Sequence, residues 1–114
     1  MAEDCIFCRI AEGEIPSEIV YEDKDIIAFK DVSPQAPIHI VIIPRKHYTS
    51  ILAIPAGDAI MGKIQTVISR LAIKFGVAED GFRVVNNCGE AGGQTVPHVH
   101  FHFLAGRNMA WPPG

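Results

Sequence analysis

The sequence predicts an α+β fold: a five-stranded antiparallel sheet with one long helix and a short N-terminal helix. Three observations lead to this class. Short runs of β-branched and aromatic residues recur between turn residues, one segment has the periodicity of an amphipathic helix, and a run near the C-terminus alternates at period two. Because short turns join most of these runs, we expect neighbouring strands to pair antiparallel.

The expected elements follow in chain order. Residues 5–12 are apolar enough for a short helix or a turn. The segment Asp23-Lys24-Asp25 separates two apolar runs, which predicts a hairpin between them. Strands are expected where β-branched and aromatic residues gather, at 19–22, 26–30, 39–44, 82–86 and 98–104.

The one clear helix signal lies in residues 58–75. Apolar residues recur there at intervals of three and four, which places them on one stripe of a helix. Gly76 follows at once and can take the left-handed conformation that ends a helix. Such a helix is roughly 27 Å long, so it can cover one face of the sheet. The stripe consists of Ile60, Met61, Ile64, Val67, Ile68, Leu71, Ala72 and Phe75.

Length and charge exclude several classes of protein. The 114 residues predict a single domain over 1–114, with a short tail at 107–114. The net charge is −3 and the basic residues are scattered, so the cationic surface that nucleic-acid binding requires is missing. No apolar run reaches the roughly 20 residues that span a bilayer, and the acidic N-terminus lacks signal-peptide features. We therefore expect a cytoplasmic protein that binds neither nucleic acid nor membrane.

Three histidines alternate with apolar residues in the run HVHFHFL. Successive side chains of a strand point to opposite faces, so His98, His100 and His102 share one face and their apolar neighbours share the other. Histidines that only decorate a solvated face are one reading, and a three-histidine metal centre is another. The first and third histidines lie roughly 13 Å apart along a strand, which is too far for one ion. The spacing favours imidazoles that serve different atoms of an extended substrate.

The sequence resembles the histidine-triad (HIT) family in this run and beyond it. HVHFHFL fits the pattern His-φ-His-φ-His-φ-φ, where φ is apolar, and DVSPQAPIHIVIIPRKH, RVVNN, GGQT and WPPG resemble the nucleotide-binding Hint branch. The resemblance covers nearly the whole chain. It implies a homodimer whose sheet continues across the interface, and hydrolysis of purine nucleoside phosphoramidates through a covalent nucleotidyl-histidine.

The resemblance also assigns catalytic roles. It makes His100 the nucleophile, and a neutral imidazole near pH 7 has the lone pair that this role requires. A backbone carbonyl is expected to accept from its other ring nitrogen. By the same resemblance, His102 and His39 hydrogen-bond the non-bridging phosphate oxygens. Thr95 stands where the family usually has serine, and its hydroxyl is expected to relay a proton to the leaving amine.

A nucleotide site is implied by the same resemblance. Asp31 would accept hydrogen bonds from the ribose hydroxyls, although a surface acid at a strand end is the simpler reading of this residue. Asn87 matches a residue at the phosphate and sugar end, and Gly93 and Gln94 belong with Thr95 to the loop beside the phosphate. The apolar slot for the base, whose members could equally be core residues, comprises Ile6, Phe7, Ile10, Phe29 and Val32.

Cys5 and Cys8 form a C-x-x-C pair in a chain with an odd number of cysteines, which makes a disulfide scaffold improbable. Two cysteines are too few for a structural zinc site, and the βαβ context of a thioredoxin-like redox pair is missing. Some histidine-triad proteins complete such a pair with two histidines, which here are His47 and His98. The resemblance thus implies a structural zinc, while catalysis needs no cofactor.

The tail at 107–114 contains prolines that prevent a helix or an internal strand. The resemblance implies that it reaches the active site of the partner in a homodimer, where Trp111 shapes selectivity for the leaving amine. Three other functions stay open at this point. A nucleotidyl transferase of this superfamily carries glutamine in place of His102, a regulatory module binds the nucleotide without turnover, and a metal-dependent hydrolase loses activity with chelator.

Overall fold

The computed structural model describes residues 4–114. No helix within these residues is long and apolar enough to cross a membrane. The elements in chain order are α1 (Ile6–Ala11), β1 (Ile19–Glu22), β2 (Ile26–Lys30), β3 (Ile38–Pro44), the 3₁₀ helix η2 (Ile51–Ala53), α2 (Ile60–Lys74), β4 (Arg83–Val85) and β5 (Phe101–Ala105).

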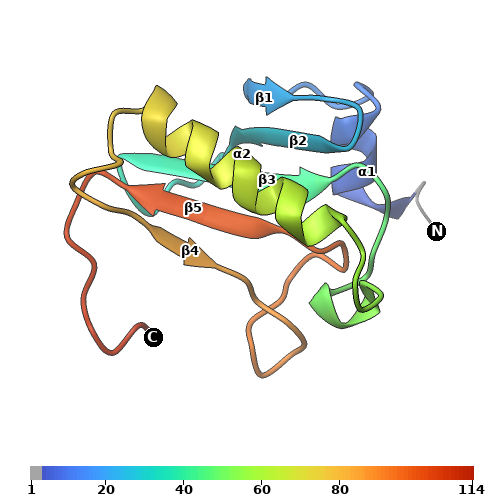
Figure 1. The fold of residues 1–114 in the computed structure, drawn as a ribbon. Helices are drawn as coiled ribbons and strands as arrows, with labels where there is room; N and C mark the ends of the chain where they lie inside the picture. The colour runs from blue at the N-terminus through green and yellow to red at the C-terminus, as the bar shows by residue number, and fades with distance from the viewer. Residues whose placement is uncertain (1–3) are drawn as a thin grey trace.

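The five strands form one antiparallel sheet in the order β1-β2-β3-β5-β4. The predicted hairpin joins β1 and β2, and Asp23 Oδ1 accepts from the backbone N–H groups of Asp25 and Ile26 at its turn, each at 2.8 Å. Figure 1 shows α2 lying across one face of the sheet, over β3 and β5. The predicted α+β class, with five antiparallel strands and two α-helices, is confirmed.

The two faces of the sheet have different cores. On one face, α2 buries its apolar stripe against inward residues of the central strands, such as Ile40, Ile42 and Phe103. On the other face, α1 packs over a smaller core that includes Phe29 and Val41. This second face also carries His39 and His102, because both alternate in phase with Val41 across the β3–β5 register. The helix and the histidines therefore occupy opposite faces, as predicted.

Most element boundaries agree with the sequence prediction. Helix α2 covers Ile60–Lys74 within the expected 58–75, and Gly76 follows in the left-handed region at φ +69°. Strand β2 matches its expected range, while the 3₁₀ helix η2 was not expected. Strand β4 is shorter than the expected 82–86, because Asn86 leaves the ladder and donates through its side-chain amide to the carbonyl of His100 at 2.9 Å.

Strand β5 begins later than predicted. We expected a strand over 98–104 that included His98 and His100, and this boundary is wrong. Continued past Phe101, the register of β5 on β3 would place Val99 opposite Pro44, which has no N–H to donate to a ladder. The N–H of Val99 instead donates to the carbonyl of Tyr48 at 2.7 Å. The alternation of faces continues through this segment, because the apolar neighbours of the histidines still lie in the α2 core.

Candidate active site and metal-ligand cluster

The side chain of His98 contacts two cysteine sulfur atoms, which gives it a different environment from the other two triad histidines. Its Nδ1 is 3.3 Å from Cys5 Sγ and 3.5 Å from Cys8 Sγ. Its Nε2 lies 2.9 Å from the carbonyl oxygen of Pro44. A carbonyl can only accept, so Nε2 carries the proton and Nδ1 presents a lone pair to the sulfurs. Burial lowers the pKa of His98 to about 4, which keeps this imidazole neutral.

His47 completes a four-membered cluster with Cys5, Cys8 and His98. Its Nδ1 lies 3.2 Å from Cys8 Sγ, and the four ligand atoms all lie within 4.8 Å of one another. Two sulfurs and two imidazole nitrogens are a donor set that structural zinc takes, and a carbonyl on the second nitrogen of a ligating histidine is the usual outer partner. Burial raises the pKa of the Cys8 thiol to about 11, which a bound cation would reverse. The residues therefore fit a zinc ion.

His100 is buried and has one of its two ring nitrogens fixed. Its Nδ1 lies 2.8 Å from the carbonyl oxygen of His98, so Nδ1 donates and the lone pair belongs to Nε2. The ring of Phe7 meets the ring of His100 edge to face, with centroids 5.0 Å apart. A neutral imidazole held in this tautomer has the free electron pair that a nucleophile requires.

His39 and His102 form a hydrogen-bonded chain behind this position. The backbone N–H of Gln35 donates to His39 Nδ1 at 3.0 Å, so the proton of a neutral His39 sits on Nε2. That Nε2 lies 2.9 Å from His102 Nδ1 and donates to it. His102 consequently carries its own proton on Nε2. The chain thus leaves His102 with one N–H free to donate to a ligand.

Asp31 lies beside this chain, with Oδ2 3.5 Å from His39 Nε2. Burial lowers the pKa of both His39 and His102, and the carboxylate of Asp31 opposes this shift in both. Both imidazoles are therefore neutral at pH 7. The three residues have ligand atoms within 4.8 Å of one another. They do not suit a metal ion, because the lone pair of a neutral His39 is already engaged by the N–H of Gln35.

A cavity of about 260 Å³ opens on this face of the sheet. Nine of the twelve predicted nucleotide-binding residues line it, namely Ile6, Phe7, Ile10, Phe29, Asp31, Val32, Thr95, His100 and His102. The sequence prediction missed Val41, which the alternation from His39 could have revealed. It also missed residues whose position depends on the pairing of distant segments, which are Ile15, Pro16, Ser17, Lys30 and Val96.

Asn87, Gly93 and Gln94 do not line this cavity, and their side chains or backbone shape the adjoining loop. Asn87 Nδ2 donates to the carbonyl of Gly92 at 2.7 Å. Gln94 donates through Nε2 to the carbonyls of Thr49 and Val96, at 2.7 and 3.0 Å. Gly93 has φ +80°, a conformation that favours glycine. These residues hold the loop that ends at Thr95.

The C-terminal tail leaves Trp111 81% exposed. Arg83 donates to the carbonyl of Ala110 at 2.8 Å, which holds the tail near the β4 edge (Figure 1). A second cavity, of about 250 Å³, lies between the tail and the His39–His102 pair. His102 therefore borders both this cavity and the one that contains His100.

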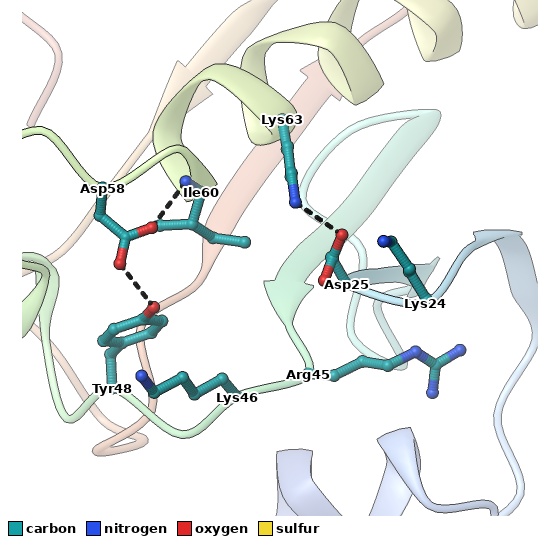
Figure 2. A pocket seen from close by; sticks show the side chains of 8 residues that line it. All are labelled: Lys24, Asp25, Arg45, Lys46, Tyr48, Asp58, Ile60 and Lys63. Carbon is teal, nitrogen blue, oxygen red and sulfur yellow. Dashed lines mark hydrogen bonds and ion pairs between the residues drawn. The ribbon is translucent and has the colours of Figure 1, made fainter.

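A third cavity, of about 190 Å³, is separate from the histidines (Figure 2). Asp58 caps the first turn of α2 by accepting from the N–H of Ile60, and it also accepts from the hydroxyl of Tyr48. Lys63 forms an ion pair with Asp25 at 2.8 Å. The ion pair joins α2 to the β1–β2 hairpin, and Asp58 joins the start of α2 to the segment after β3, so these contacts have a structural role. The cavity is lined by Lys24, Asp25, Arg45, Lys46, Tyr48, Asp58, Ile60 and Lys63.

Comparison with known proteins agrees with this arrangement. The family described as HIT domain matches residues 12–109. A purine nucleoside phosphoramidase from Escherichia coli K12 is 45% identical over 110 residues, which are 96% of this chain and 92% of that protein. A crystal structure of a HIT family hydrolase from Legionella pneumophila superposes with a TM-score of 0.94 at 48% identity, covering 96% of this chain and 99% of that one.

A histidine triad protein from Clostridium difficile superposes with a TM-score of 0.92 at 51% identity, covering 94% of each chain. Both solved structures and the bacterial enzyme span almost the full length of this chain. The alternating histidines, the tautomer of His100 that leaves the Nε2 lone pair free, and these similarities lead to one conclusion: the chain belongs to the HIT family.

Proposed function

We propose that this protein hydrolyses the P–N bond of purine nucleoside phosphoramidates through a nucleotidyl-His100 intermediate. The observation that carries the proposal is the hydrogen bond from His100 Nδ1 to the carbonyl of His98, which leaves the Nε2 lone pair free in a residue that lines the main cavity. The name of the Escherichia coli relative, purine nucleoside phosphoramidase, supports this substrate class.

The reaction proceeds in two displacements at phosphorus. His100 Nε2 attacks phosphorus with its lone pair, and the P–N bond to the amine breaks. The amine takes up a proton as it leaves, with the hydroxyl of Thr95 as the relay beside the cavity. Water then attacks the nucleotidyl-His100 phosphorus, which releases the nucleoside monophosphate and restores the imidazole. In both steps His102 donates its Nε2–H to the phosphoryl oxygens.

The nucleoside occupies the part of the cavity between α1 and β2. Its purine lies among apolar side chains, of which Ile6 and Val32 are 48% and 96% exposed and gain most from being covered. Its ribose hydroxyls donate to Asp31, whose Oδ1 already accepts from the N–H of Ser33 at 2.7 Å. That hydrogen bond holds the carboxylate in place before the sugar arrives.

We further propose that Cys5, Cys8, His47 and His98 hold a structural zinc ion. The buried S₂N₂ donor set supports this assignment. Bound zinc supplies a cross-link between the start of α1 and the segment before β5. Phe7 lies between the two cysteines in sequence and touches His100, so the cross-link steadies one wall of the nucleotide slot. No step of the reaction passes through the metal.

A homodimer is the third part of the proposal. β4 is an edge strand, in which Val84 is 37% exposed; Phe82, directly before the strand, is 39% exposed, and Trp111 is 81% exposed. Pairing of two β4 edges would continue the sheet and cover these apolar groups. The tail would then reach the partner's site, where Trp111 contacts the leaving amine. A cytoplasmic location stays a prediction.

The test is turnover of an adenosine phosphoramidate by the wild type and by His100→Ala, with AMP binding measured on both. We expect turnover by the wild type, loss of turnover in the variant and AMP binding by both. Wild-type turnover no greater than that of His100→Ala, together with AMP binding, would favour a regulatory nucleotide-binding module. Loss of wild-type activity in chelator, while the fold persists, would favour a metal-dependent hydrolase.

A further inference from the structure

Ser17 has a buried hydroxyl without a partner. Among the side-chain nitrogen and oxygen atoms of residues 4–114, Ser17 Oγ is the one buried atom that forms no hydrogen bond. Leaving a buried hydroxyl unsatisfied destabilises a fold, so such groups are rare and call for an explanation. Ser17 also lines the cavity that we assign to the nucleoside.

The strand register places this hydroxyl at a specific point of that cavity. Ile19 pairs with Phe29, and the N–H of Lys30 donates to the carbonyl of Glu18 at 2.9 Å. Ser17 therefore lies opposite Asp31, one pair beyond Lys30. Side chains two residues apart share a face, so Ser17 lies on the face that carries Phe29 and Asp31. Under the proposed function, Phe29 belongs to the base slot and Asp31 to the ribose site.

We propose that Ser17 determines nucleoside binding by a hydrogen bond to an atom at the junction of purine and ribose, either purine N3 or the ribose 2′-hydroxyl. This inference rests on the proposed function. Rotation about the Cα–Cβ bond is the movement that would turn the hydroxyl from the wall of the cavity toward the nucleotide. Adenine and guanine both present N3, so the contact favours neither base over the other.

The chemistry of the surrounding wall supports this role. The residues that flank Ser17 along the cavity are apolar, namely Ile15, Pro16 and Phe29. Lys30 is tied to Glu18 in an ion pair at 2.8 Å. In this proposal the hydroxyl of Ser17 gains a hydrogen-bond partner only when the ligand binds. This distinguishes it from a serine that stabilises the fold. Its removal weakens nucleotide binding without destabilising the protein.

The experiment compares Ser17→Ala with the wild type in AMP affinity, by calorimetry, and in melting temperature. We expect AMP to bind about three- to tenfold more weakly, as the loss of one neutral hydrogen bond gives, with an unchanged or higher melting temperature. Ser69→Ala is the matched control. Its hydroxyl accepts from Gln65 Nε2 at 3.0 Å on α2, across the sheet from the cavity, so its AMP affinity should equal that of the wild type.

Two nucleotide analogues identify the atom that Ser17 contacts. AMP without N3 (3-deaza-AMP) and AMP without the 2′-hydroxyl (2′-deoxy-AMP) are titrated into the wild type and Ser17→Ala. The substitution should cost no further affinity on one of the two analogues, because the contact is already lost there. Three results would overturn the inference while the proposed function stands: Ser17→Ala weakens the binding of both analogues as much as that of AMP, its AMP affinity is unchanged, or its melting temperature is lowered. Failure of the wild type to bind AMP would overturn both.

Discussion

Replacing His39 by asparagine tests how the histidines divide their work at the phosphate. Asparagine places its Oδ1 close to the position of the histidine Nδ1, so it still accepts from the N–H of Gln35. It lacks the Nε2–H that lies 2.9 Å from His102 Nδ1. The substitution therefore removes the group that fixes the tautomer of His102 while the backbone contact is retained.

The structure sets the size of the expected effect. One neutral hydrogen bond contributes about 1 kcal/mol, which corresponds to roughly a fivefold change in rate. Removal of a donor that contacts the transition state directly costs about 10²–10³-fold. We thus expect kcat/KM to fall about fivefold in His39→Asn and about 10²–10³-fold in His102→Ala. The loss in His102→Ala must be the larger of the two, because His39 acts only through its hydrogen bond to His102.

The assay is kcat/KM for one adenosine phosphoramidate in the wild type, both single variants and the double variant. If His39 acts through His102, the double variant is about as slow as His102→Ala alone. The sequence-based expectation, in which both histidines contact the phosphate, predicts that the two losses multiply. Multiplied losses would refute the hydrogen-bonded chain as the route by which His39 contributes.

Three further outcomes follow from the site. Protein prepared without chelator should hold about one zinc per chain by elemental analysis, and Cys5→Ala/Cys8→Ala should hold none; a metal-free native protein contradicts the cluster assignment. Deletion of residues 107–114 should change relative rates across several amines more than the melting temperature, and unchanged amine preference contradicts a role for the tail. Burial lowers the pKa of His39 and His102 below 6.5 in the folded protein. As the pH falls past this value, the unfolded chain therefore binds more protons than the folded protein, and the free energy of unfolding decreases. Urea unfolding at about pH 7 and about pH 5.5 should show a smaller decrease in His39→Asn than in the wild type, whereas equal decreases contradict the shift for His39.

Much of the fold could be predicted because it rests on local periodicity. The stripe of α2 and the β-branched run of β2 identify their elements from neighbouring residues alone. The start of β5 could not be predicted in this way. It depends on Pro44, which is distant in sequence and would lie opposite Val99, and on Asn86, whose side-chain amide donates to the carbonyl of His100. The sequence of the histidine run itself does not indicate either effect.

The candidate site could also be predicted only in part from the sequence. Alternation alone assigned the triad histidines to one face, and the family resemblance supplied most residues of the nucleotide cavity. The tautomers of these histidines depend on backbone atoms, which a pattern of side chains cannot predict: the N–H of Gln35 and the carbonyls of Pro44 and His98. The unsatisfied hydroxyl of Ser17 is likewise a property of packing. Sequence thus indicates which side chains meet, and the structure indicates where their protons lie.

The central claim is that His100 carries the nucleotide during turnover. It is tested by mixing wild-type protein with an adenosine phosphoramidate, quenching rapidly at alkaline pH and locating bound AMP by peptide mass spectrometry. The account predicts an adenylyl group on the peptide that contains His100, placed on that residue by fragmentation and missing in His100→Ala. Turnover without any adduct, or an adduct on His98 or His102 instead, would contradict it.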